Sequence, residues 1–183
     1  MRFRPDRITI AIVVGTLMIT AGCGRSRPGS APAADPSKPK DEFAGAIALR
    51  ASNGRYVCAD QAEGIPRAGA LIANRESIGD WERFELIKQD SSHYALRSST
   101  GRYVSAEREG AFQAVADREW VGDWELLEIV RLDSGRFAFR TTEGRYLGAD
   151  LSEGAACPLC ILSDRTEAGA WETFELEHLE TQP

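Results

Sequence analysis

The sequence predicts an all-β domain built from three similar units, and three observations carry this prediction. A Gly-Arg-Tyr motif recurs at intervals of about 45 residues, and a Trp-Glu pair follows each copy. Each unit contains about four short apolar runs separated by Gly, Ser, Asn and Asp. Within the units, apolar residues do not follow the period of a helix. The motifs begin at Gly54, Gly101 and Gly144, and the pairs at Trp81, Trp124 and Trp171.

The first unit shows what each strand should look like. Its apolar runs predict strands at residues 46–50, 55–59, 70–74 and 81–87. In the first of these, Ile47 and Leu49 alternate with Ala48 and Arg50, as expected when one face of a strand is buried. The other units repeat this pattern with inward Tyr94 and Leu96, inward Phe137 and Phe139, and outward Arg97 and Arg140.

Two positions in each unit predict a change of chain direction. Trp81 breaks the alternation that Phe84 and Leu86 follow, so we expect a bulge or corner just after the tryptophan. A glycine separates the first two strands of each unit, where a tight hairpin requires the positive φ that glycine adopts without steric cost. These glycines are Gly54, Gly101 and Gly144.

Three four-stranded units restrict the possible architectures. A β-propeller needs about four to eight such units around its axis. Three units close most naturally into a single β-trefoil, which we place at residues 44–181. Its repeats are expected at about 46–88, 93–131 and 136–179.

Several recurring motifs resemble fascin-type β-trefoil repeats. They are Gly-Arg-Tyr-[Val/Leu]-x-Ala, a middle strand ending in Asn or Asp and then Arg, and Gly-x-Trp-Glu-x-[Phe/Leu]-Glu-[Leu/Ile]. The resemblance covers about Ala46 to Leu179 and implies the β-trefoil fold. Proteins of the fascin group cross-link actin filaments, whereas ricin-type β-trefoils bind sugars through Gln-x-Trp repeats. Gln-x-Trp does not occur in this sequence.

The N-terminal segment is of a different kind. Three arginines precede an apolar stretch at residues 8–20, and Thr20-Ala21-Gly22-Cys23 follows. The stretch is too short for a bilayer-spanning helix of about 20 residues, and its flanks are typical of a cleaved leader. The segment resembles a bacterial lipoprotein signal peptide at residues 1–22. This resemblance implies cleavage before Cys23 and lipidation of Cys23 by diacylglycerol and a further acyl chain such as palmitate; an uncleaved membrane anchor is the alternative.

Residues 23–43 predict a disordered tether between the lipid and the domain. The segment contains Pro28, Pro32, Pro36 and Pro39 among Ser, Ala, Lys and Asp, and has too few apolar side chains to form a core. We therefore expect a domain attached to the cell membrane or outer membrane by its N-terminal lipid and facing the periplasm or the exterior. A single trefoil in this setting makes actin cross-linking unlikely.

Charge and residue usage argue against several classes of function. The formal net charge is −6 and no basic run is present, which is unfavourable for binding nucleic acid. His93 and His178 are the only histidines and lie in no metal-ligand spacing, and no phosphate loop or nucleophile elbow occurs. Paired glutamates recur in every repeat, which indicates a solvated strand face or fixed hydrogen bonds. We expect no enzyme, no metal and no cofactor.

Four cysteines need separate explanations. With Cys23 lipidated, Cys157 and Cys160 are candidates for a small structural disulfide, and a redox-active dithiol is the alternative. Cys58 aligns with Ser105 and Gly148, so its position requires a small residue. It remains unassigned, either as a free thiol or as the partner of a cysteine in the third repeat.

A ligand site is more easily found where the repeats differ than where they agree. The repeated tyrosines and tryptophans are expected to pack in the core and against the hairpins. Trp120 aligns with Ser77 and Glu167 in a predicted surface loop close to Phe112, and either binds a ligand or folds back onto its own loop. With Trp120 and Phe112 as ligand-binding candidates, we expect a non-catalytic recognition module for a glycan or an envelope protein. The alternative is a structural spacer without a small ligand.

Overall fold

The computed structural model describes residues 41–62 and 67–180. The predicted signal peptide, Cys23 and nearly all of the predicted tether lie outside these residues. Within the described ranges, no helix has the length and apolar character needed to cross a bilayer. The described residues belong to one compact unit.

Twelve strands and one short 3-10 helix, η1 (Asp133–Gly135), make up the regular structure of the described residues, so the predicted all-β class is confirmed. The first repeat contributes β1 (Gly45–Ala51), β2 (Tyr56–Asp60), β3 (Ala70–Arg75) and β4 (Phe84–Lys88). The second contributes β5 (His93–Ser98), β6 (Tyr103–Ala106), β7 (Ala114–Arg118) and β8 (Leu127–Arg131). The third contributes β9 (Phe137–Thr141), β10 (Tyr146–Ala149), β11 (Ile161–Arg165) and β12 (Phe174–His178).

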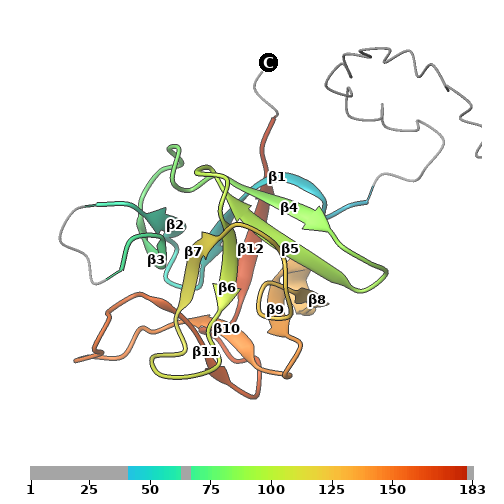
Figure 1. The fold of residues 1–183 in the computed structure, drawn as a ribbon. Coiled ribbons are helices and arrows are strands. Elements are labelled where there is room, and N and C mark those ends of the chain that lie inside the picture. The colour runs from blue at the N-terminus through green and yellow to red at the C-terminus, as the bar shows by residue number, and fades with distance from the viewer. Residues whose placement is uncertain (1–40, 63–66, 181–183) are drawn as a thin grey trace, which may run out of the picture. The chain divides into compact units, whose positions relative to one another are not determined.

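The first and last strands of the three repeats close into a barrel. Going round it, β1 pairs with β4, β4 with β5, β5 with β8, β8 with β9, β9 with β12, and β12 again with β1, all antiparallel (Figure 1). Closure leaves none of these strands with a free edge. Its interior holds the main apolar core, which includes Ile47, Leu49, Phe84, Leu96 and Phe139. These residues follow the alternation predicted from the sequence.

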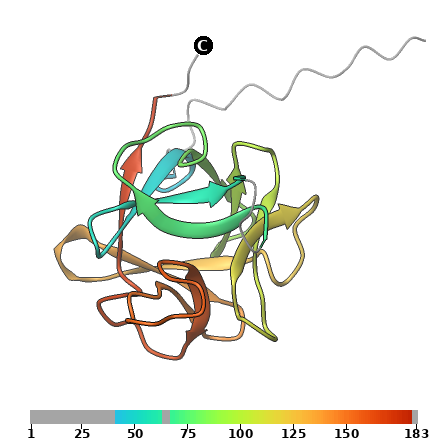
Figure 2. The ribbon, with the colours of Figure 1, turned by 90° about the vertical axis from the view of Figure 1, so that its left-hand side faces the viewer.

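The two middle strands of each repeat form a hairpin, and the three hairpins join in a ring that caps the barrel (Figure 2). One residue just before each third strand has a positive φ, and its carbonyl accepts a backbone N–H of the next repeat. The acceptors are Gly69 (φ 83°), Phe112 (φ 51°) and Leu159 (φ 65°), and the donors are Ala116 at 2.8 Å, Ser163 at 2.7 Å and Ala73 at 2.8 Å. These hydrogen bonds join repeat one to repeat two, repeat two to repeat three, and repeat three to repeat one.

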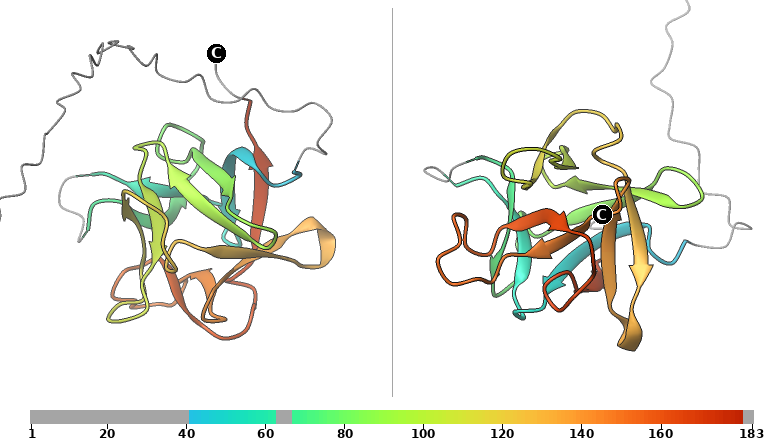
Figure 3. Two further views of the ribbon diagram at one scale, coloured as in Figure 1. Left: turned by 45° about the vertical axis from the view of Figure 1, so that its right-hand side comes forward. Right: turned by 90° about the horizontal axis from the view of Figure 1, so that it is seen from below.

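The predicted chain reversals are present, and one strand boundary was wrong. Gly54, Gly101 and Gly144 have φ of 77°, 80° and 79° in hairpin turns, as expected. The fourth strand of repeat one begins at Phe84 rather than at residue 81, because Trp81 and Glu82 form the turn that was expected just after the tryptophan. The same offset occurs in repeats two and three, where β8 begins at Leu127 and β12 at Phe174. Figure 3 shows the strands and their connecting loops from two further sides.

Residues 41–43 attach the N-terminal end of the described unit to the barrel. The Phe43 ring makes edge contacts with Tyr94 and Phe137, with centroids 6.0 and 5.3 Å away. The Asp41 carboxylate accepts hydrogen bonds from Lys88 Nζ at 2.6 Å and the Tyr94 hydroxyl at 3.0 Å. Desolvation alone would raise the pKa of Asp41, but the bonds from Lys88, Phe43 N–H and Tyr94 outweigh it, so its pKa is lowered. Residues 41–43 are therefore held against the barrel by both apolar and polar contacts.

Candidate functional site

The Trp-Glu pair of every repeat forms a common structural frame. Its glutamate is buried in all three repeats and accepts a hydrogen bond from the glycine three residues earlier. The bonds join Gly79 N–H to Glu82 at 2.7 Å, Gly122 N–H to Glu125 at 2.7 Å, and Gly169 N–H to Glu172 at 2.8 Å. Such charge-assisted bonds stabilise a loop strongly. This confirms the prediction of fixed hydrogen bonds for these glutamates.

The second glutamate of the motif lies on the outside of the barrel. Glu85 pairs with Arg97 and Glu128 with Arg140 across neighbouring strands, while Glu175 lies opposite Arg50 in the β1–β12 register. These are cross-strand pairs of opposite charge, which contribute modestly to the stability of a sheet. The outward direction predicted for the three arginines is correct.

The repeated tryptophans lie at the edge of the core and not inside it: Trp81 packs against a small apolar cluster of the hairpins, as expected, but none of the three is fully buried. Trp124 is 37% exposed, and Trp81 and Trp171 are only half-buried. An arginine from the end of the third strand lies over each ring, with Arg75 5.6 Å from the Trp81 centroid, Arg118 5.9 Å from Trp124 and Arg165 5.9 Å from Trp171. The turn places the tryptophans outside the barrel because the strand begins only after them. Every repeat therefore presents an indole and a guanidinium at its surface.

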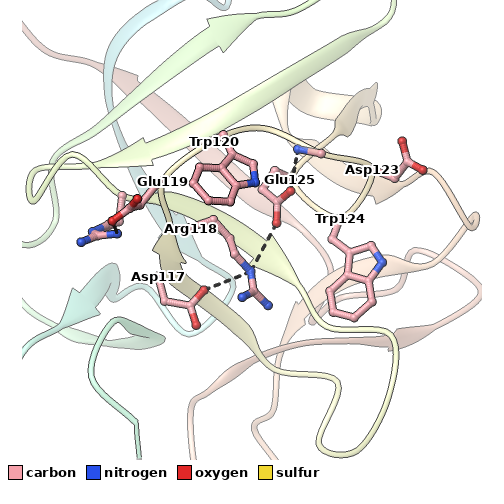
Figure 4. Close-up of a pocket in the computed structure, with 9 residues that line it drawn as sticks. Asp117, Arg118, Glu119, Trp120, Asp123, Trp124 and Glu125 are labelled. Atoms are coloured by element: carbon pink, nitrogen blue, oxygen red, sulfur yellow. Dashed lines mark hydrogen bonds and ion pairs between the residues drawn. The ribbon is translucent and has the colours of Figure 1, made fainter.

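Only repeat two adds a second tryptophan to this surface within the described residues. The loop between β7 and β8 forms an open pocket of about 600 Å³ (Figure 4). Trp120 is 73% exposed, which is the highest exposure of any large apolar side chain in the described residues, so it does not fold back onto its loop. The pocket is lined by Arg102, Asp117, Arg118, Glu119, Trp120, Gly122, Asp123, Trp124 and Glu125.

The charged groups of this pocket are partly paired. Arg102 Nη1 lies 2.7 Å from Glu119 Oε1. Arg118 Nε lies 3.4 Å from Asp117 Oδ1 and 3.7 Å from Glu125 Oε1, as the dashed lines in Figure 4 show. Both pairings of Arg118 use Nε, and its two Nη groups make no further hydrogen bond within the described residues. The pocket thus combines two indoles with hydrogen-bond donors and acceptors, which is the composition of a site for a polar ligand.

The corresponding loop of repeat three has a related pocket with different chemistry. It is lined by Arg165, Glu167, Gly169, Trp171 and Glu172 together with two alanines, and its volume is about 460 Å³. Glu167 replaces Trp120 and Ala170 replaces Asp123. This pocket has the common frame but neither the aromatic ring of Trp120 nor the carboxylate of Asp123. It therefore provides an internal control for repeat two.

Phe112 does not line the repeat-two pocket, although it was expected near Trp120. Its carbonyl accepts hydrogen bonds from the N–H and the hydroxyl of Ser163 at 2.7 and 3.2 Å, and Arg145 lies 5.2 Å from its ring centroid. Phe112 therefore joins repeats two and three in the cap. Its alignment with Gly69 is the signal in the sequence that marks this position as one of unusual backbone conformation.

Sequence reasoning missed the polar residues of the pocket. Arg118 and Glu125 were noted only as repeated residues, and Asp123 was not noted at all. A comparison of the three loops does not single out Asp123, because repeat one has Asp80 at that position and only repeat three differs, with Ala170.

The cysteines lie away from this pocket, in a second apolar cluster that contains Cys58, Ala70, Ile72 and Cys160. The structure joins Cys157 and Cys160 in a disulfide with a Cα–Cα distance of 5.5 Å. Cys58 is a buried free thiol, and desolvation raises its pKa. Gln113 donates to Cys160 Sγ at 3.1 Å. No group of His, Cys, Asp and Glu in the described ranges is arranged to hold a metal ion.

The six-stranded barrel capped by a ring of three hairpins defines a β-trefoil. The sequence profile of the Fascin domain matches residues 65–175. The chain therefore belongs to the Fascin domain family. A comparison with curated protein sequences finds no significant match.

Solved structures share the fold at low sequence identity. A designed threefold-symmetric protein, ThreeFoil, has a TM-score of 0.61 and 17% identity, covering 73% of this chain and 99% of its own. The Rhizoctonia solani agglutinin has a TM-score of 0.58 and 20% identity, covering 76% and 99%. SeviL, solved with asialo-GM1 saccharide, has a TM-score of 0.56 and 14% identity, covering 73% and 97%. Structural neighbours of this trefoil thus include glycan-binding lectins.

Proposed function

We propose that this protein is a non-catalytic glycan-binding module and that its ligand occupies the repeat-two pocket. The exposure of Trp120 is the observation that carries the proposal. An indole left in water loses the free energy that burial of its apolar surface would provide. A pyranose ring has an apolar face of C–H groups that covers an indole, and hydroxyls at its edge that require polar partners.

The surrounding residues supply those partners. Arg118 offers two Nη groups as donors, and the carboxylates of the lining offer acceptors for hydroxyl groups. The lectins among the structural neighbours support a glycan ligand, because they show that this fold accommodates one. The repeated glutamates of the frame are committed to backbone N–H groups, which argues against their use as a catalytic acid and base.

Binding of the purified full-length chain to a broad array of glycans, including cell-wall fragments, tests this proposal. We expect selective binding to a small set of structures and competition by the same sugars in solution. An array without any bound glycan would contradict the proposal. It would direct the search to a protein partner of the cell envelope or to a spacer role.

We further propose that the module is displayed at a bacterial cell surface or in the periplasm through lipid on Cys23. The basic start, the short apolar stretch and Thr20-Ala21-Gly22-Cys23 support this part of the proposal. Expressed in a bacterium, the wild type should lose residues 1–22 and gain the mass of its acyl groups. The Cys23→Ser variant should show neither change in intact-mass measurement, and lipid on that variant would overturn the assignment.

A further inference from the structure

We infer that the repeat-two pocket selects an uncharged sugar over an acidic one and that Asp123 is the residue that sets this preference. The inference rests on the proposed function, since it specifies the ligand of that same pocket. It is drawn from the balance of charge in the pocket, from the free carboxylate of Asp123, and from the contacts that hold Asp123 in place.

The charge of the lining is negative. Two arginines, Arg102 and Arg118, face four carboxylates, those of Asp117, Glu119, Asp123 and Glu125. Two neighbouring arginines bring their own carboxylates: Arg67 contacts Asp117 at 2.6 Å but pairs with Glu107, and Arg108 pairs with Glu143 at 3.1 Å. Including both pairs leaves the excess at two negative charges. An anionic sugar therefore enters a field of its own sign, which costs free energy in a partly desolvated site.

Asp123 differs from the other three carboxylates of the lining. Asp117 and Glu119 form ion pairs, and Glu125 accepts the N–H of Gly122. The Asp123 side chain is exposed and has no hydrogen bond or ion pair with any described residue. Figure 4 shows this carboxylate at the edge of the group of lining residues, pointing away from Trp120 and without a dashed line to a neighbour. Asp123 is thus the one lining carboxylate that neither forms an ion pair nor accepts a hydrogen bond within the described residues.

The backbone at Asp123 is nevertheless fixed from outside the loop. Its carbonyl accepts hydrogen bonds from Arg108 Nη2 and from the Thr142 hydroxyl, both at 3.1 Å. Arg108 also donates to Thr142 at 2.8 Å and lies 5.8 Å from the Trp124 ring centroid. Since Thr142 belongs to repeat three, this contact ties the pocket to the next repeat. These contacts fix the main chain at Asp123, which limits the positions that its side chain can take when it binds a ligand.

The chemistry of the ligand follows from this geometry. A carboxylate only accepts hydrogen bonds, and its two oxygens suit two neighbouring hydroxyl donors. A neutral pyranose with a vicinal diol provides them, and the C–H face of another ring of the same oligosaccharide covers Trp120. A sulfate or carboxylate on the sugar near Asp123 removes donors and adds repulsion.

Paired probes test this inference. The full-length chain is titrated with maltotriose, cellotriose, chitotriose and lactose, and with the singly sulfated form of each. We expect the preferred neutral sugar to bind at least about tenfold more tightly than its sulfated form, with a difference that shrinks at high salt. Asp123→Asn should weaken neutral binding by about tenfold and reduce the discrimination against sulfate. Asp80→Asn, at the same position of repeat one, is the control and should change neither.

The possible failures are distinguishable. Equal or tighter binding of the sulfated sugars to the wild type would overturn the inference and leave the glycan proposal standing. Unchanged affinity and selectivity in Asp123→Asn would also overturn the inference and leave the glycan proposal standing. If none of the eight probes binds to the wild type, both the inference and the proposed function fail for these sugars. Thermal unfolding of each variant shows whether a loss of binding reflects a loss of fold.

Discussion

Replacing Trp120 by alanine should weaken glycan binding by about 30-fold or more, the effect typical of a tryptophan at the centre of a binding site. The side chain is 73% exposed and makes no hydrogen bond with a described residue, so its removal should leave the free energy of unfolding almost unchanged. Isothermal titration with the sugar selected on the array measures the affinity directly.

Glu167→Ala is the matched control for this variant, because Glu167 occupies the position of Trp120 in repeat three. Its affinity should equal that of the wild type. If Trp120→Ala retained the wild-type affinity, the repeat-two pocket would not be the binding site. If both variants lost affinity to the same extent, the ligand would contact more than one repeat.

Replacing Gly69 by alanine should destabilise the fold by about 2–4 kcal/mol, since it combines backbone strain with a steric clash. Gly69 has a φ of 83°, and an added Cβ would lie 2.6 Å from the carbonyl oxygen of Ala116. The Gly69 carbonyl also accepts the N–H of Ala116, so any shift that relieves the clash strains the ring of hairpins. Urea denaturation of the wild type and the variant measures the loss.

Gly54→Ala separates the two causes. Gly54 has a similar φ of 77°, but an added Cβ there meets no atom within 4 Å. It should therefore lose only about 1 kcal/mol, from the unfavourable positive φ. Equal losses in the two variants would show that close packing between repeats one and two contributes nothing measurable to the cap.

The regular parts of this fold could be predicted because each rests on a local requirement that recurs three times. Positive φ at Gly54 and its counterparts follows from hairpin geometry, and burial of Ile47 and Leu49 follows from alternation. The position of the tryptophans could not be deduced in the same way. Trp81 is apolar and repeated, which suggested the core, but it lies in a turn that the hydrogen bond from Gly79 N–H to the buried Glu82 stabilises.

The ring of hairpins shows a second limit of sequence reasoning. Phe112 and Leu159 adopt positive φ, which is uncommon for residues other than glycine. Their conformation is imposed by hydrogen bonds to the next repeat, and these pairings between distant segments leave no local pattern. Phe112 was therefore interpreted as a ligand-binding aromatic, whereas the structure shows it linking repeats two and three.

Only part of the candidate site could be predicted from the sequence, and the difference has a physical reason. Trp120 could be identified because a large apolar side chain in a polar loop is costly and occurs in one repeat only. Asp123 could not be identified with the same ease, since an acidic residue in a surface loop is ordinary. Its availability became apparent only when the partners of the neighbouring carboxylates were known.

The most direct measurement is the response of the four tryptophan indole N–H signals to added glycan, followed by ¹H–¹⁵N NMR. Each repeat carries one tryptophan of the common frame, and repeat two carries Trp120 in addition, so the signals report separately on the three loops. Our account predicts large shifts for Trp120 and Trp124 and small ones for Trp81 and Trp171. Shifts at Trp81 or Trp171 with Trp120 unmoved would contradict it and place the ligand in another repeat.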